Sequence, residues 1–103
     1  MSDGVIITVD MVIKPEFSEA VRSGIPAMLK DTARFKGLRS IRVVQHQHDP
    51  HHVLIVEHWD CEGDYKTYYA WRDRDGDMAR ALALLSSHRM DVWPQQIGFA
   101  AAA

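Results

Sequence analysis

The sequence predicts an α+β domain with the element order βαββαβ, and three patterns support this prediction. Apolar and polar residues alternate along residues 4–13, which is typical of a strand with one buried face. Apolar residues then recur at helical spacing from Phe17 to Leu29. Further on, Asp49-Pro50 is a tight-turn signal between two strand-like segments, as in a hairpin. Strand, helix and hairpin in this order favour a mixed sheet-and-helix fold.

The first helix has its own start, bend and stop signals. Pro15 suits the first helical turn because its missing N–H would have no partner there. Gly24 and Pro26 interrupt the apolar stripe, so we expect a bend rather than an end at that point. Gly37 is a plausible stop after the helix.

The remaining segments complete a ferredoxin-like, split-βαβ arrangement. In this fold a four-stranded antiparallel sheet carries its helices on one face. We expect a single domain over residues 1–100, with the alanines at 101–103 set apart as a frayed end or a cloning addition. The predicted segments after residue 37 are a strand over 38–47, a strand from 51 or 52 to 59, a helix over about 62–72, an amphipathic segment from 78 to about 88 and a last strand over 92–100.

Composition excludes several classes of function. The chain has 103 residues, which suits one domain, and its net charge of −2 gives no electrostatic reason to bind nucleic acid or an anionic membrane. The apolar runs are of strand length, and the first residues show no charged-then-apolar signal pattern. A single cysteine, Cys61, excludes an internal disulfide framework and suits a reducing cytoplasm. We therefore expect a cytoplasmic protein.

The strand ending at Trp59 is apolar on both faces. Val53 and Ile55 fall on one side, and Leu54 and Val56 on the other. Helices cover only one side of such a sheet, and a bare apolar sheet face is an association site. We expect a homodimer whose sheets meet.

A hairpin centred on Asp49-Pro50 would bring several site candidates to one face. Arg42 would lie opposite Glu57 as a cross-strand ion pair, beside Ile55. The resulting face mixes apolar, aromatic, charged and imidazole groups, as ligand pockets do. In this register the predicted partners are His46 with Val53, Val44 with Ile55, Arg42 with Glu57, and Ser40 with Trp59.

The end of this strand resembles a known family. A strand ending Glu57-His58-Trp59-Asp60, followed by an aromatic residue at Tyr65, resembles the antibiotic biosynthesis monooxygenase family over roughly residues 5–99. The resemblance implies a dimeric α+β barrel. It also implies a monooxygenase that needs no cofactor and oxidises an anthrone- or quinol-like aromatic polyketide with O₂.

The resemblance also assigns roles by position. Trp59 and Tyr65 match substrate-pocket residues, and Arg80 lies close to the position of a late-helix arginine used by some members. The pocket asparagine of the polyketide oxygenases is Ile55 here. The histidine of the quinol-oxidising branch is Tyr68.

Cofactor-free oxidation needs a flat pocket, a proton acceptor and stabilisation of an anion. Tyr68 or His46 would relay the proton, and Arg80 or Arg42 would stabilise the anion. The aromatic residues that we expect to pack the substrate ring are Trp59, Tyr65, Tyr68 and Trp71.

Simpler interpretations stay open for the same residues. Trp59 is as well suited to the core as to a pocket wall, and the tyrosines also fit helix packing. The histidines of 46–52 share no cysteine or carboxylate pattern, so we expect no physiological metal. Residues 73–77 lack a calcium-loop spacing and suggest an inter-helix turn, while Cys61 is a weak nucleophile candidate.

Two other functions compete with the monooxygenase. The same barrel hosts cyclases and isomerases, and a non-catalytic ligand-binding or dimerisation domain belongs to a third class. A cavity that reaches Trp59 and Tyr65 would favour an enzyme. An interface filled solid by Tyr65, Tyr68 and Leu82 would favour the non-catalytic domain.

Overall fold

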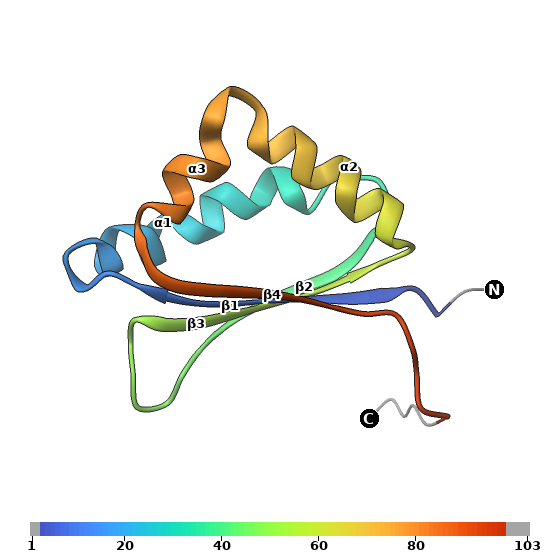
Figure 1. Ribbon diagram of the computed structural model, residues 1–103, viewed down its shortest axis with the longest axis horizontal. Helices are drawn as coiled ribbons and strands as arrows, with labels where there is room; N and C mark the ends of the chain where they lie inside the picture. The colour runs from blue at the N-terminus through green and yellow to red at the C-terminus, as the bar shows by residue number, and fades with distance from the viewer. Residues whose placement is uncertain (1–2, 99–103) are drawn as a thin grey trace.

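The computed structural model describes residues 3–98 and consists of one antiparallel sheet with its helices on one face (Figure 1). The strand order is β2-β3-β1-β4, which confirms the predicted ferredoxin-like fold. The alanines at 101–103 lie outside the described residues. The elements are β1 Val5–Ile13, α1 Pro15–Thr32, β2 Leu38–Gln45, β3 His52–Trp59, α2 Glu62–Asp73, a 3-10 turn Arg74–Gly76, α3 Asp77–Leu82 and β4 Leu85–Trp93.

Helix α1 follows the sequence signals closely. Pro15 occupies its first turn, and the helix continues through Pro26 without ending. Its buried residues are Ser18, Ile25 and Thr32. Successive members of this set are seven residues apart, so they lie on one face, and this face packs toward the sheet.

The last strand lies earlier in the chain than predicted. The amphipathic segment was expected to continue to residue 88, but α3 ends at Leu82 and β4 begins at Leu85. Leu85 fits both patterns, because it continues the helical spacing and also pairs with Ile13 of β1. Pairing with the open edge of β1 decides in favour of the strand. Residues 94–98 of the predicted strand are not in the sheet, and 99–100 lie outside the described residues.

The β2–β3 hairpin has a register one residue away from the predicted one. Gln45, not His46, lies opposite Val53. The turn runs from Asp49 to His52, with the His52 N–H donating to the Asp49 carbonyl at 3.1 Å. An odd number of residues therefore separates the paired Gln45 and Val53, and the residues of β2 from Ser40 onward move to the other face relative to the prediction. A register irregularity between Leu38 and Ser40 leaves Leu38 opposite Trp59, on the helix-covered face.

This shift removes the predicted ion pair between Arg42 and Glu57. Arg42 lies opposite Val56, and Ile41 lies opposite Glu57. Alternation then places Arg42 on the face of the sheet without helices, whereas Glu57 faces the helices. The predicted orientation of β3 is correct, because its odd-numbered residues are buried and its even-numbered residues are less so.

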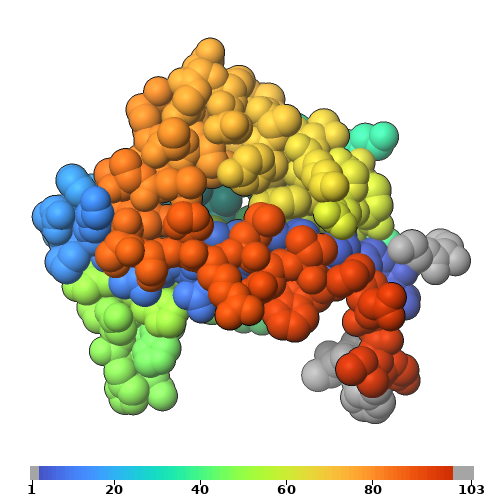
Figure 2. All heavy atoms as spheres, in the orientation of Figure 1, coloured from blue at the N-terminus to red at the C-terminus, as the bar shows by residue number. Residues whose placement is uncertain are grey.

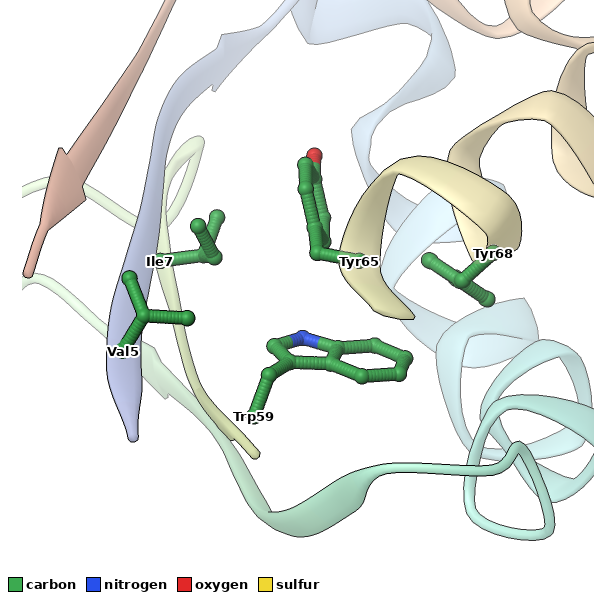
Figure 3. Packing of buried hydrophobic residues seen from close by; sticks show 5 residues of the cluster. All are labelled: Val5, Ile7, Trp59, Tyr65 and Tyr68. Carbon is green, nitrogen blue, oxygen red and sulfur yellow. The ribbon is translucent and has the colours of Figure 1, made fainter. Parts of the chain in front are cut away.

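The core consists of two clusters at opposite ends of the sheet, and Val9 of β1 packs against both. In the first cluster the indole of Trp59 lies between β1 and α2 (Figure 3). The second cluster lies toward the hairpin end of β3. The buried residues of the first are Val5, Ile7, Trp59, Tyr65 and Tyr68, and those of the second are Met11, Ile13, Ile25, Val53 and Ile55.

Replacement of Trp59 by alanine should strongly destabilise the protein, because this side chain is 0% exposed. We expect the free energy of unfolding to fall by about 3–5 kcal/mol. Phe17→Ala is the control, since Phe17 is an aromatic residue on α1 that is 39% exposed, and it should cost far less. Urea denaturation of both variants measures the difference, and equal losses would contradict the assignment of Trp59 to the core.

Candidate functional site

A groove runs between α2 and β4 and has a volume of about 360 Å³. Figure 2 shows the molecule hollowed there, between the helices and the edge strand. Its volume falls within the rough range of small-molecule sites, about 300–1,000 Å³. The lining residues are Glu62, Tyr65, Lys66, Tyr69, Ala70 and Asp73 of α2 with Met90 and Val92 of β4. Aromatic and apolar side chains thus form its wall, and charged groups of α2 contribute to its lining.

Glu57 of β3 is a buried carboxylate on the helix-covered face, only 5% exposed. Its Oε1 accepts a hydrogen bond from Nε1 of Trp59 at 3.0 Å. Burial raises the pKa of Glu57, while the Trp59 hydrogen bond and the charge of Arg72 act in the opposite direction. A carboxylate in this position is a stronger base than an exposed one.

Tyr65 of α2 is largely buried and contributes to the groove lining. Burial, followed by the negative charge of Glu57, raises the pKa of Tyr65, so its phenol stays protonated. The hydroxyl donates to Sδ of Met90 at 2.9 Å, and a thioether is a weak acceptor. The Tyr65 hydroxyl could therefore donate instead to a stronger acceptor, such as an oxygen atom of a ligand bound in the groove.

Arg72 of α2 links the two long helices. Its Nε donates to the hydroxyl of Tyr68 at 3.0 Å, and Nη2 donates to Oγ1 of Thr32 at 2.6 Å. Nη2 also donates to the carbonyl of Met28 at 2.5 Å. The Tyr68 and Thr32 hydroxyls are themselves 2.9 Å apart in a buried hydrogen bond. This network fixes α2 against α1.

The structure brings five of the residues selected from sequence to one end of the helix-covered face: Glu57, Trp59, Tyr65, Tyr68 and Trp71. The Trp59 and Tyr68 ring centroids are 5.2 Å apart, and those of Tyr68 and Trp71 are 6.4 Å apart. Trp59 is fully buried and does not line the groove. The groove therefore reaches Tyr65 but stops short of the indole.

The other selected residues lie elsewhere. Ile55 is buried in the second cluster. Arg42 is exposed on the face without helices, and His46 lies beside Leu54 of that same face. Arg80 is exposed on α3, where it pairs with Asp77.

Two histidines of the hairpin stack on each other, and one of them also contacts a carboxylate. The rings of His46 and His52 are stacked with centroids 5.2 Å apart, and Nε2 of His52 lies 2.8 Å from Oδ1 of Asp10. Within residues 3–98, no three histidine, cysteine, aspartate or glutamate side chains are grouped so as to hold a metal ion. Cys61 is exposed and free. No helix in the described part of the chain is long and apolar enough to cross a membrane.

Three residues of the site were missed by the sequence analysis: Arg72, Thr32 and Met90. Arg72 follows Tyr68 by four residues, and this helical spacing is a signal that could have indicated their contact. Thr32 is 36 residues from Tyr68, so local spacing gives no indication of this pairing. Met90 was hidden because β4 was placed too late in the chain.

The sequence profile of the antibiotic biosynthesis monooxygenase family matches residues 4–76. No curated protein matches the chain significantly.

Several solved structures have the same fold at low sequence identity. A candidate antibiotic biosynthesis monooxygenase from Deinococcus radiodurans has a TM-score of 0.77 at 19% identity, covering 96% of this chain and 99% of that one. A Pseudomonas aeruginosa protein has a TM-score of 0.76 at 17% identity, with coverage of 93% and 97%. An asparagine-to-alanine variant of SnoaB, a cofactor-independent oxygenase from Streptomyces nogalater, has a TM-score of 0.71 at 15% identity, with coverage of 95% and 100%.

The raised pKa of Glu57 predicts a pH-dependent contribution to stability. Because the pKa of Glu57 is raised above its ordinary value of 4.5, the folded state binds this proton more tightly than the unfolded chain does. The free energy of unfolding should therefore fall as pH rises through the folded pKa, by about 1.4 kcal/mol for each unit of difference. Glu57→Gln should remove this slope, and Glu19→Gln, which changes an exposed carboxylate on α1, should keep it. Urea denaturation from pH 4 to 8 checks this, and parallel profiles for Glu57→Gln and the wild type would contradict it.

Proposed function

The chain belongs to the antibiotic biosynthesis monooxygenase family, and from this we propose that it is a cofactor-independent monooxygenase of the cytoplasm. Its proposed substrate is an electron-rich hydroxylated aromatic compound of the anthrone or quinol type, and its second substrate is O₂. The likeness in fold to SnoaB supports the reaction class, and the free Cys61 thiol suits a reducing compartment.

The observation that carries the proposal is the groove beside Tyr65. Tyr65 and Tyr69 provide aromatic surface from α2, and Met90 and Val92 provide apolar surface from β4. A flat ring system fits such a wall, and an oxygen of that ring would replace the Met90 thioether as acceptor for the Tyr65 hydroxyl. Tyr65 would then stabilise the negative charge that develops on the substrate.

The proposed reaction draws its electrons from the substrate. Loss of a proton from an anthrone methylene gives an anion, which passes one electron to O₂. The resulting radical and superoxide combine through a new C–O bond to form a peroxide anion. Protonation gives the hydroperoxide, and loss of the second methylene proton with cleavage of the O–O bond leaves a carbonyl group and one molecule of water. The methylene carbon is oxidised, and both atoms of O₂ are reduced.

We also propose that the protein is a homodimer formed through the open sheet face. The helices cover only the opposite face (Figure 1). Val44 and Trp93 are 42% and 55% exposed on the uncovered side. Such an apolar face favours a second copy of the same surface. The apolar residues of this face are Ile6, Val12, Val44, Leu54, Val56 and Trp93.

Oxygen consumption tests the proposed reaction. The purified protein, incubated with hydroxynaphthalenes, anthrones and quinols without added flavin or metal, should consume O₂ with at least one of them. Tyr65→Phe should lower kcat by about 10²-fold, because it removes the donor to the developing charge. Thr67→Ala removes an exposed hydroxyl from the same helix and should leave the rate unchanged. Tight binding of a ring compound without any oxygen uptake would refute the monooxygenase and favour a cyclase or a binding domain.

The dimer is tested by one substitution at the centre of the open face. Val56 lies between Thr8 and Arg42, so a glutamate there gains a neighbouring cation within its own sheet while placing charge in the interface. We expect light scattering after gel filtration to give twice the mass of one chain for the wild type and the mass of one chain for Val56→Glu. Phe17→Glu, on the exposed side of α1, should remain dimeric. A monomeric wild type would refute this interface.

A further inference from the structure

Resting on the proposed function, we propose that Met90 is a site of oxidative modification, where hydrogen peroxide forms a sulfoxide that weakens binding of the aromatic ligand in the groove. Met90 combines three properties that such a site needs. Its side chain is accessible, its sulfur is the acceptor for the Tyr65 hydroxyl, and oxidation replaces this weak acceptor by a strong one.

Met90 is accessible to small oxidants from solvent. Its side chain is 45% exposed and lines the groove, which is open at the surface of the molecule (Figure 2). Met90 lies opposite Val9 of β1, on the face of the sheet that carries the helices. A dimer formed through the opposite face therefore leaves Met90 accessible. Met11 of β1, by contrast, is only 8% exposed.

The Met90 sulfur is held against the hydroxyl of Tyr65. This hydroxyl donates to Sδ of Met90 at 2.9 Å, and Tyr65 as a whole is only 6% exposed. Burial raises the pKa of Tyr65, so the phenol keeps its proton and remains a donor. Because a thioether accepts weakly, the hydroxyl is easily released to an oxygen of a ring ligand. Met90 thus keeps the Tyr65 donor available for binding.

Hydrogen peroxide converts the Met90 thioether into a sulfoxide without a further reactant. A sulfur lone pair attacks one peroxide oxygen, an S–O bond forms and the O–O bond breaks. The sulfur loses two electrons and the peroxide gains them. The departing hydroxide takes the proton from the transferred oxygen and leaves as water. Superoxide that escapes from the proposed oxygenation would disproportionate to O₂ and hydrogen peroxide, which places a source of this oxidant in the groove.

The sulfoxide opposes ligand binding in two ways. Its oxygen carries a partial negative charge and accepts a hydrogen bond far better than a thioether does. The flexible methionine side chain lets this oxygen turn toward the Tyr65 hydroxyl, so a ring oxygen has to compete for the same donor. The sulfoxide also places a polar group in the apolar wall beside Val92. We expect the affinity for a hydroxylated ring to fall by about tenfold.

Met28 of α1 provides a matched comparison within the same chain. It is 42% exposed, nearly as much as Met90, but it does not line the groove. Its contact with Arg72 is made by the backbone carbonyl and not by the side chain. Exposure alone predicts similar oxidation of Met28 and Met90, whereas position in the groove predicts that only oxidation of Met90 affects binding.

Peroxide treatment, followed by mass spectrometry and ligand binding, tests the site. Catalase then removes the peroxide, and dithiothreitol reverses disulfide and sulfenic acid at the exposed Cys61 but leaves methionine sulfoxide. Peptide mass spectrometry measures the sulfoxide at each methionine, and equilibrium dialysis without O₂ measures binding of 2-naphthol. We expect Met90 to oxidise at least about tenfold faster than Met11, and the Kd of 2-naphthol to rise about tenfold as Met90 is oxidised.

Three variants and one enzyme serve as controls. Met28→Leu keeps the backbone carbonyl and should lose affinity on peroxide treatment as the wild type does. Met90→Leu, whatever its own starting affinity, should bind 2-naphthol equally before and after treatment. Tyr65→Phe should show a smaller change, because it has no hydroxyl for the sulfoxide to capture. Methionine sulfoxide reductases for both epimers should restore the affinity of the oxidised wild type, a measurement that needs no substitution.

The outcomes separate this inference from the proposed function. Oxidation of Met90 no faster than that of Met11, an affinity unchanged by oxidation, or a loss that follows Met28 would overturn the modification site and leave the monooxygenase standing. No binding of 2-naphthol to the untreated protein would also overturn it, while the oxygen assay judges the reaction by itself. Loss of binding that follows Met90, in a protein that consumes no O₂, would uphold the site and refute the monooxygenase.

Discussion

The hydrogen bond between Trp59 and Glu57 is the interaction on which the rest of the site depends. Each residue is buried, and each supplies the partner that the other lacks: the indole N–H needs an acceptor, and the carboxylate needs a donor. Because they are two residues apart on β3, the strand itself sets their common direction. The pair fixes an oriented carboxylate on the floor of the sheet and a flat aromatic surface beneath α2, and Tyr65 packs against that surface with ring centroids 5.9 Å apart.

A second constraint comes from above the sheet, where Arg72 joins α2 to α1. Its guanidinium holds the Tyr68 hydroxyl, Oγ1 of Thr32 and the carbonyl of Met28, which come from two helices far apart in sequence. With α2 fixed in this way, Tyr65 presents its ring to the groove at β4. The same cation lowers the pKa of Glu57 against the larger effect of burial. Arg72 therefore both holds α2 in position and acts on the pKa of Glu57 through its positive charge.

Sequence periodicity was sufficient for much of the fold but not for its edges. The alternation of β3 correctly placed Glu57 and Trp59 beneath the helices. The prediction of the β2 register was wrong because it depends on whether the hairpin loop is odd or even. The turn has Pro50 at its second position as its sequence suggests, but the strands pair about a centre at Asp49 and not between Asp49 and Pro50. β4 failed because Leu85 satisfies helical and strand patterns equally, and only pairing with β1 decides between them. The contact of Arg72 with Thr32 is long-range and leaves no local pattern.

The apolar core is interrupted at one point of the sheet, and a polar residue is buried there. Two apolar clusters occupy the two ends of the sheet, and Val9 is the residue packed against both. Glu57 lies near this junction, in a row whose other members, Ile41, Ile7 and Val92, are apolar. An apolar residue at position 57 would extend the core and remove a buried charge, but it would leave the N–H of the fully buried Trp59 indole without its acceptor. The hydrogen bond with Trp59 therefore accounts for a polar residue in a row whose other members are apolar.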